Sequence, residues 1–291
     1  AKSGVDRSKG VPDVSQFPEL SFPNVQRGKL KNGIEVILAE RHTIPVTQIQ
    51  MQFNAGYAAD HGNKLGTASF VSAMLDEGTK TLDSVEIAKR RESLGAIIRS
   101  GTGLDTSNVS LNALDANLAP SIDLFADVVR NPAFRDADIE RIRAQWLAGI
   151  AQEKTQPQGM ALRTLPPLLY GEGHAYAIPF TGSGTEASIT SLTPDDLRGY
   201  VRDFIRPDNA TILVAGDTTL ERIIPQLDKV FGDWTAPSSA VPKKNIAQVA
   251  APEKPRVFLM DKPGAQQSLI LAGVVAPSTK AKNNLEIQTM N

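Results

Sequence analysis

The chain has 291 residues, of which 41% are hydrophobic and 22% charged, and its formal net charge is −1. This composition is typical of a folded protein with a substantial core, and the near-zero charge excludes binding of nucleic acid or a membrane surface through bulk charge. No apolar run approaches the roughly 18 residues that a membrane-spanning helix needs. The sequence has no cysteine, which excludes disulfides and thiolate ligands, and only three histidines, His42, His61 and His174.

Both ends of the sequence suggest a fragment of a longer protein. The chain does not begin with methionine, and residues 284–291 indicate a helix that is cut short. Residues 1–26 contain many Gly, Pro, Ser and Asp residues, which predicts a linker or a surface arm. Any localisation signal would lie outside this sequence.

The first half of the chain predicts strands and helices in mixed order. Asn32-Gly33 is a typical hairpin turn, and Asp83 followed by Glu86 is a capping box at the start of a helix. The expected elements are a hairpin at 29–39, a strand at 46–53, helices at 65–75 and 84–94, strands at 97–102 and 107–114, and helices at 118–130 and 136–154.

The second half begins with a loop-rich stretch, 155–188, with one short helical piece at 162–170. The run Thr-Pro-Asp-Asp at 193–196 predicts a helix start, because proline suits the first helical position and acids suit the first turn. The remaining expected elements are a helix to about residue 204, a strand at 210–215, a helix at 219–231, a Pro-, Ala-, Ser- and Lys-rich linker at 235–255, and strands at 256–260 and 268–275.

Hairpins and helix pairs, rather than strict alternation of strand and helix, favour an α+β fold. We expect a twisted, mostly antiparallel sheet with helices packed on one face. The predicted organisation is an arm at 1–26, a first domain at 27–234, a linker at 235–255 and the start of a second domain at 256–291.

Several kinds of chemistry are absent from the sequence. No glycine pattern predicts a phosphate site, and Gly182-Ser183-Gly184 lacks the strand–turn–helix context of a nucleophilic serine. No histidine stands three or four residues from another, so a His-rich metal site is not expected. Each histidine is interpreted as a surface or hydrogen-bonding residue, with His174 ordering its loop.

Residues 66–79 read Gly-Thr-Ala-Ser-Phe-Val-Ser-Ala-Met-Leu-Asp-Glu-Gly-Thr. This stretch resembles the signature helix of the pitrilysin/insulinase family of zinc metallopeptidases, Gly-x-Ala-His-x-x-Glu-His-Met-x-x-x-Gly-Thr. In that family the two histidines hold zinc and the glutamate between them is the general base for a bound water. The residues that match the family frame are Gly66, Ala68, Met74, Gly78 and Thr79.

The residues that carry the family chemistry do not match. Ser69 stands at the first histidine, Ser72 at the glutamate and Ala73 at the second histidine. The family's third ligand is a glutamate on a later helix, and the run Leu-Ala-Gly-Ile at 147–150 places Gly149 at that position, within one residue. The resemblance therefore implies that the base and all three zinc ligands are missing, so that this chain holds no cofactor.

The resemblance covers residues 27–291. Matching segments include the opening strands, the Gly-Glu-Gly-His-Ala-Tyr loop at 171–176, the helix start at 191–197 and the strand end Leu-Val-Ala-Gly-Asp at 213–217. Residues 256–291 resemble the truncated start of a second domain of the family. The chain as a whole resembles the second repeat of long, exported bacterial members, which suggests a periplasmic parent.

The resemblance implies a non-catalytic half that closes a peptide chamber, with zinc held by a partner half or subunit that carries His-x-x-Glu-His. In the family, substrate peptide adds as a strand to a sheet edge that carries Asn-Ala-x-Thr. The aligned residues are Arg99, Ser100, Gly101 and Thr102, of which only Thr102 matches. An ordinary edge strand is the competing interpretation of the same four residues.

Two other functions remain open from the sequence. The first is a structural or assembly subunit of the same fold without a role in proteolysis. The second is an unrelated hydrolase that uses Ser69 or Ser72, with Asp76 four residues after Ser72 on the same helix face.

Overall fold

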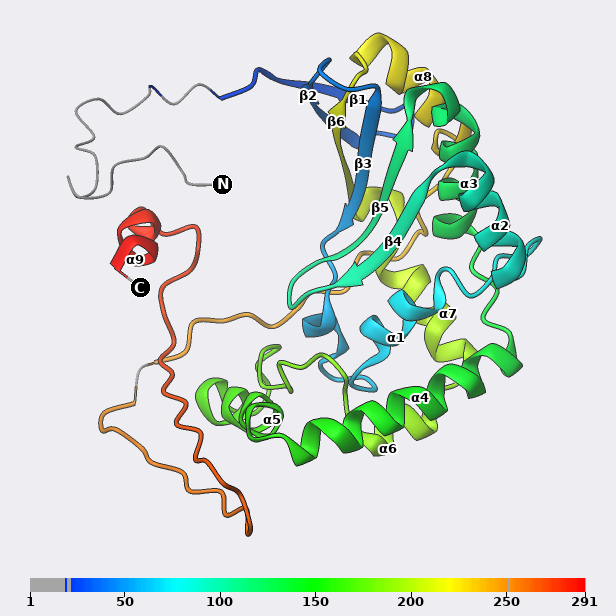
Figure 1. Cartoon of the computed structure of the whole chain (residues 1–291). Coiled ribbons are helices and arrows are strands. Elements are labelled where there is room, and N and C mark those ends of the chain that lie inside the picture. Colours follow the sequence, from blue (N-terminus) through cyan, green and yellow to red (C-terminus); the bar gives the residue numbers. More distant parts are fainter. Residues whose placement is uncertain (1–18, 20–21, 251, 291) are drawn as a thin grey trace, which may run out of the picture.

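The protein is described here by a computed structural model that covers residues 19, 22–250 and 252–290. Six strands form one sheet in the spatial order β1-β2-β6-β3-β5-β4 (Figure 1). β2 and β6 run parallel, and all other neighbouring strands run antiparallel. The strands are β1 (Val25–Lys29), β2 (Glu35–Glu40), β3 (Val46–Phe53), β4 (Ile97–Thr102), β5 (Ser107–Leu114) and β6 (Ala210–Gly216).

Helices cover one face of the sheet and one of its ends (Figure 1). α3 packs on β5 and α8 on β1, while α1 lies beside β4 and contacts α4 and α7. No helix within the described ranges is both long and apolar enough to cross a bilayer. The helices are α1 (Thr67–Met74), α2 (Ser84–Leu94), α3 (Leu118–Arg130), α4 (Asp136–Thr155), α5 (Pro157–Tyr170), α6 (Glu186–Ser191), α7 (Pro194–Phe204), α8 (Leu220–Phe231) and α9 (Asn284–Met290), with short 3₁₀ turns η2 (Tyr57–Asp60), η3 (Asp115–Asn117) and η4 (Pro207–Asn209).

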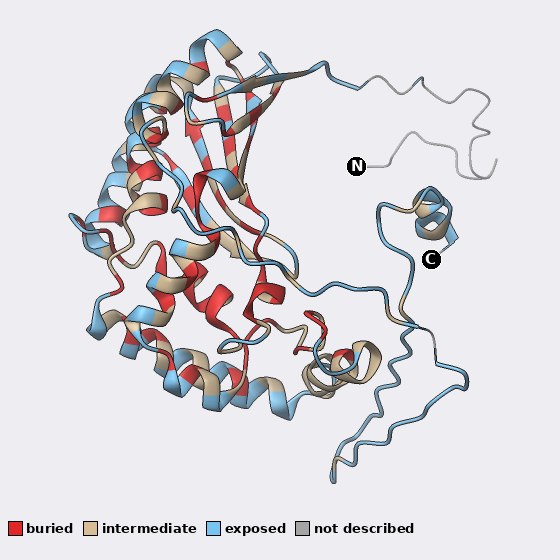
Figure 2. Ribbon diagram, turned by 180° about the vertical axis from the view of Figure 1, so that it is seen from behind, coloured by how far each residue is buried: buried red, intermediate tan, exposed pale blue. Residues whose placement is uncertain are grey.

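The two faces of the sheet differ because side chains alternate along each strand. On β3, Ile49 and Met51 are fully buried under the helices, whereas Gln48 is exposed on the opposite face. The same alternation of buried and less buried residues follows the other central strands (Figure 2). The predicted fold, a mostly antiparallel sheet with helices on one face, is therefore confirmed.

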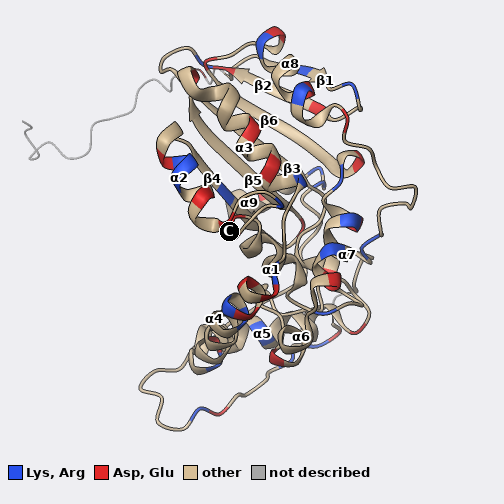
Figure 3. Cartoon of the chain, turned by 90° about the vertical axis from the view of Figure 1, so that its right-hand side faces the viewer, with Lys and Arg blue, Asp and Glu red and all other residues tan. Residues whose placement is uncertain are grey.

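Charged residues are found along the covering helices, whereas the central strands β3, β5 and β6 contain none (Figure 3). Lys229 of α8 and Asp123 of α3 form an ion pair at 3.1 Å. Both side chains are largely exposed, so this pair contributes little to stability. The helices are therefore held on the sheet mainly by the apolar core.

The structure corrects the interpretation of residues 155–188 as mostly loop. α5 begins at Pro157 rather than at residue 162, because proline suits the first helical position. Gly159 lets α5 turn tightly against the end of α4, since a Cβ there would lie 2.3 Å from the carbonyl oxygen of Glu153. The loop at 182–184 also leads into a short helix, α6, which a capping box of Thr185 and Ser188 begins.

The strands expected at 256–260 and 268–275 are not formed. Val257 and Leu259 are each 94% exposed, and neither segment pairs with a strand in the described part of the chain. An apolar segment gains stability as a strand only when neighbours pair with it and cover it. The helix expected at the end of the sequence is present as α9, and the arm expected at 1–26 lies mostly outside the described residues, with β1 beginning at Val25.

We predict that the capping box of α2 stabilises the fold measurably. The Asp83 carboxylate accepts the Glu86 N–H at 2.8 Å, and the Glu86 carboxylate accepts the Asp83 N–H at 2.9 Å. Asp83→Ala should lower the free energy of unfolding by about 1 kcal/mol in urea denaturation. Glu92→Ala on the same helix is the control, since the Glu92 side chain has no hydrogen bond among the described residues, and an equal loss in both variants would contradict the prediction.

Candidate functional site

The residues at the predicted ligand and base positions lie on two helices that contact each other. Ser69, Ser72 and Ala73 are on α1, where Ser69 and Ala73 are half-buried on one face and Ser72 is 8% exposed. Gly149 lies on α4, is exposed, and has open space where a Cβ would project.

Aromatic packing joins the two helices next to these positions. The rings of Phe70 on α1 and Trp146 on α4 meet edge to face with centroids 5.6 Å apart. Trp146 lies one helical turn before Gly149, so this contact joins the two helices that carry the predicted positions.

The residues at these positions do not fit a zinc ion. A hydroxyl at Ser69, a methyl group at Ala73 and a glycine at position 149 replace the two imidazoles and the carboxylate that would bind zinc, and the Ser72 hydroxyl replaces the carboxylate of the general base. Nowhere among the described residues do three His, Cys, Asp or Glu side chains gather closely enough to hold a metal. The junction of α1 and α4 therefore brings together the two helices that carry the predicted ligand positions, but its side chains cannot bind zinc.

The predicted substrate strand lies at an edge of the sheet and is fastened to α1. In the part of the chain that the structure describes, β4 pairs with β5 alone. The Ser100 hydroxyl donates to the Ser72 carbonyl at 2.6 Å, and the Thr102 hydroxyl donates to the Ala68 carbonyl at 3.4 Å. The four residues Arg99, Ser100, Gly101 and Thr102 thus run alongside the helix that carries the predicted ligand positions.

The outer edge of β4 has free backbone groups. The Arg99 carbonyl accepts the Ser110 hydroxyl from β5, while the Ile98 carbonyl accepts the Arg91 guanidinium from α2, each at 3.3 Å. Because alternate residues of an antiparallel strand face its partner, the backbone of Ser100 faces outward like that of Ile98. No backbone partner for Ser100 on this side occurs in the described residues.

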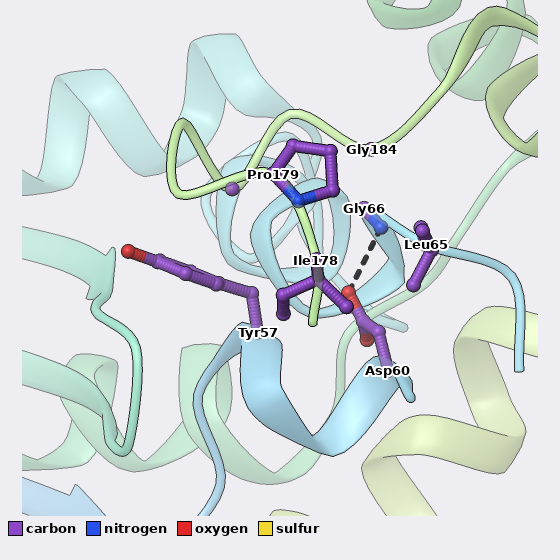
Figure 4. Close-up of a pocket in the computed structure, with 8 residues that line it drawn as sticks. Tyr57, Asp60, Leu65, Gly66, Ile178, Pro179 and Gly184 are labelled. Atoms are coloured by element: carbon purple, nitrogen blue, oxygen red, sulfur yellow. Dashed lines mark hydrogen bonds between the residues drawn. The ribbon is translucent and has the colours of Figure 1, made fainter. Parts of the chain in front are cut away.

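A buried carboxylate that the sequence interpretation missed fixes the start of α1. Asp60, at the end of η2, is 1% exposed and accepts the Gly66 N–H at 2.9 Å (Figure 4) and the Ala68 N–H at 3.0 Å. It borders a small recess of about 160 Å³, partly open to solvent, which Tyr57 and Ile178 also line. The only sequence signal was an acid six residues before the signature Gly66.

Burial raises the pKa of the Asp60 carboxyl from 3.8 to about 8, because loss of solvent disfavours the charged form. The hydrogen bonds from the Ala68 and Gly66 amides oppose this shift. Burial also raises the pKa of nearby Tyr200, whose hydroxyl lies 3.1 Å from that of Ser107. Asp60 is therefore a structural group that titrates far from its usual range.

Ser183 has a structural role, in agreement with its interpretation as a loop residue. Its hydroxyl donates to Glu153 at 2.7 Å and accepts from Arg163 at 2.8 Å, and its carbonyl accepts from Trp146 at 2.9 Å. Ser183 thereby ties its loop to α4 and α5. The neighbouring Gly184 lies against α1, since a Cβ there would come within 2.0 Å of the Leu65 carbonyl oxygen.

The described structure does not support a serine hydrolase. No histidine or carboxylate bonds to the side chain of Ser69 or Ser72 within the described chain. The carboxylate of Asp76 pairs instead with Arg91 at 3.4 Å. A serine without a neighbouring base is a poor nucleophile.

The three histidines do not gather into a site. His174 accepts the Tyr176 N–H at 2.9 Å and lies 3.0 Å from the Ala247 carbonyl oxygen, so it orders its loop as expected. His42 lies on the surface between Asp217 at 2.7 Å and Glu40 at 3.1 Å, and these hydrogen bonds raise its pKa. Both are therefore hydrogen-bonding residues.

Two family models match the chain. One is described as insulinase (peptidase family M16) and matches residues 35–176. The other is described as the peptidase M16 inactive domain and matches residues 191–291. Together they include every strand and helix except β1 and α6. β1 lies before the first match, and only the last residue of α6 falls within the second.

Two curated relatives carry contrasting names. The uncharacterized zinc protease YmxG of Bacillus subtilis is 24% identical over 74% of this chain and 52% of its own length. The non-peptidase homolog YmxG of Helicobacter pylori is also 24% identical, over 74% of this chain and 48% of its own length. The chain thus spans about half the length of these relatives.

A solved structure with a similar fold is the peptidase M16 inactive domain from Pseudomonas fluorescens. It superposes with a TM-score of 0.72 at 32% identity and covers 79% of this chain and 54% of its own. The superposition supports the six-stranded α+β architecture independently of the family models.

We predict that Asp60 makes the protein less stable as pH rises from about 4 to about 8. Because the folded-state pKa lies above the unfolded one, the folded state holds a proton in this window that the unfolded state releases. The free energy of unfolding should then fall with pH, by at most about 1.4 kcal/mol per pH unit. Urea denaturation at several pH values should show a smaller slope for Asp60→Asn than for wild type.

His42→Gln is the control for this experiment. The raised pKa of His42 gives a contribution of the same sign, which is present at low pH and lost as pH rises through the folded-state pKa. The slope due to Asp60 should persist in the His42→Gln background. Identical slopes for that variant and for the double variant with Asp60→Asn would refute the assignment.

Proposed function

Because the chain belongs to the insulinase family, peptidase family M16, we propose that it is a non-catalytic lobe of a zinc metallopeptidase. In this role it closes a peptide chamber and helps to bind the substrate. Another half or subunit of the same family holds the zinc and hydrolyses the peptide bond.

The junction of α1 and α4 is the main support for this proposal. Its helices, aromatic contact and capping carboxylate are complete, yet Ser69, Ala73 and Gly149 supply no ligand. A lobe that keeps the family fold but lacks the zinc ligands can still form one wall of a peptide chamber. Zinc chemistry then belongs to the partner, which would carry His-x-x-Glu-His.

The edge strand gives this lobe a means of holding peptide. The free outer backbone of β4 at Ser100 can pair with an extended chain, which needs no particular side chain. The departure from the family's Asn-Ala-x-Thr at Arg99, Ser100 and Gly101 therefore leaves the pairing itself possible.

We also propose that residues 256–291 are the first part of a second domain. The apolar runs at 256–260 and 268–275 would then pair with strands from outside this sequence. The length of the curated relatives, about twice the matched part, agrees with such an arrangement.

A structural or assembly subunit without a proteolytic role is the second candidate. The name of the Helicobacter pylori relative, a non-peptidase homolog, favours it, as does the missing asparagine on β4. The two candidates differ in peptide binding, which only the chamber lobe requires.

We predict that the chain neither retains zinc nor cleaves peptides alone. After exposure to zinc and dialysis, metal analysis should find no stoichiometric zinc, because hydroxyl and methyl groups cannot replace imidazole. A zinc peptidase of the same family, treated in parallel, is the positive control. One tightly bound zinc per chain, with peptide cleavage that a chelator abolishes, would overturn the proposal.

We predict that peptide binding depends on the backbone of β4. Ser100→Ala and Ser100→Pro both remove the hydroxyl bond to Ser72, but only proline removes the outward N–H. Ser100→Pro should bind a fluorescently labelled unfolded peptide about tenfold more weakly than Ser100→Ala in an anisotropy titration.

Circular dichroism of both variants controls for folding, since proline is tolerated at edge positions. Equal affinities of the two variants would contradict binding at this edge. No binding by the wild-type chain at any accessible concentration would favour the assembly subunit.

A further inference from the structure

The linker expected at 235–255 is attached to the first domain over most of its length. Its described residues form no helix or strand, in agreement with their Pro-, Ala-, Ser- and Lys-rich composition. Residues 235–249, which we name the strap, nevertheless make specific contacts with the domain at three places. Figure 2 shows the strap as a mostly exposed segment that crosses the domain.

The first attachment is Arg206, which lies just before η4 and is 2% exposed. Its guanidinium forms a bidentate pair with Asp208 and also donates to the strap carbonyls of Pro237 at 3.0 Å and Ser239 at 2.8 Å. Asp208 balances the charge of the buried guanidinium, and the two strap carbonyls accept from its Nη2 group, which attaches the strap to the domain; Nη1 has no hydrogen-bond partner among the described residues.

The second attachment is Lys244, whose side chain is only 9% exposed although it belongs to the strap. Its ammonium group donates to the Asp105 carbonyl at 2.7 Å and to the Ala55 carbonyl at 2.9 Å. The Asp105 carboxylate lies 3.9 Å away. The adjacent Lys243 is exposed and makes no hydrogen bond within the described chain.

The third attachment lies in the loop at 171–176. The Ala175 N–H donates to the Asn245 carbonyl at 2.8 Å, and the Asn245 side chain donates to the Gly173 carbonyl at 2.6 Å. The His174 ring reaches the Ala247 carbonyl at 3.0 Å. The strap is thus held on both sides of Lys244.

The two acceptors of Lys244 lie at places that matter to the candidate site. Asp105 belongs to the turn between β4 and β5, directly after the edge strand. Ala55 lies between β3 and η2, and the same two segments are joined by the Tyr57 N–H to the Gly103 carbonyl at 3.0 Å and the Ala58 N–H to the Leu104 carbonyl at 2.9 Å. Lys244 therefore closes a contact between the end of β4 and the segment that leads to Asp60 and α1.

We infer that Lys244 is a positioning residue that couples the strap to β4. With Lys244 inserted, the turn at 103–106 is held against residues 55–58, which fixes the end of the edge strand. Withdrawal of the strap removes the donor from both carbonyls and leaves that end held by the amides of Tyr57 and Ala58. The strap, which connects the domain to the following part of the chain, thereby determines how firmly the end of β4, the candidate peptide edge, is held.

The positioning of the turn is independent of any ligand, whereas its effect on peptide rests on the proposed function. A simple packing role for Lys244 would lower overall stability without favouring any one segment. The two roles therefore differ in where the backbone becomes more exposed to exchange.

Hydrogen exchange measured by mass spectrometry on the full chain tests the inference. Lys244→Met keeps the stem of the side chain but removes the donor. Exchange should become about tenfold faster at residues 98–106 and 55–58, as expected for loss of a charge-assisted hydrogen bond, and remain unchanged in β2 and β6.

Two variants serve as matched controls. Lys243→Met changes an exposed lysine of the same segment and should leave exchange unchanged. Asn245→Ala removes a strap contact at Gly173 and should speed exchange at 171–176 but not at 98–106. This second control separates a general loosening of the strap from the loss of Lys244.

The outcomes decide the inference and the proposed function separately. Equal exchange at 98–106 in Lys244→Met and Lys243→Met, or a uniform increase over the whole sheet, would overturn the positioning role. Weaker binding of the labelled unfolded peptide by Lys244→Met than by Lys243→Met would support the coupling, and equal affinity despite local loosening would overturn it. If the wild-type chain bound no peptide, the proposed function would fail while the exchange results still decided the positioning of the turn.

Discussion

Helix α1 begins in the interior of the protein, and its first N–H groups need a buried acceptor. Asp60 supplies it with both carboxylate oxygens, on Gly66 and Ala68. The edge strand depends on this helix in turn, because the hydroxyls of Ser100 and Thr102 donate to α1 carbonyls. The buried carboxyl group of Asp60 thus fixes α1, and the other parts of the candidate site are arranged against this helix. The same burial disfavours the charged form of Asp60.

The same arrangement explains how the family frame can persist without the family chemistry. Gly66 has a φ of +95°, and a Cβ there would lie 2.8 Å from the Ser183 carbonyl oxygen, so packing alone requires glycine. Gly149, by contrast, faces open space, and Ala73 is only half-buried. A ligand position whose side chain packs against little, such as Gly149, can change without disturbing the fold. Gly66 cannot, because a side chain there would collide with the loop at 182–184.

Local patterns predicted the elements whose causes are local. The hairpin at Asn32-Gly33, the capping box of Asp83 and the alternation of β3 all appear as expected. Features that arise from tertiary contact were missed: the early start of α5, where Gly159 packs on the end of α4, and the attachment of Lys244 in a segment of linker composition. The apolar runs at 256–260 and 268–275 show the converse, since a strand pattern yields no strand without partners to pair with it.

A lobe that supplies no chemistry can contribute to catalysis only through geometry, by the edge that it presents and the surface that it closes. In the proposed chamber, the order of β4 is then the property that such a lobe has to control. A connector that ends in free coil would leave this edge independent of the rest of the parent protein. The strap instead places an ammonium group between Ala55 and Asp105, so a displacement of the following chain that passes the attachments at Asn245 and Ala247 reaches the end of β4. In the proposed role, the position of Lys244 gives the lobe a physical route by which the arrangement of the parent protein changes how firmly peptide is held.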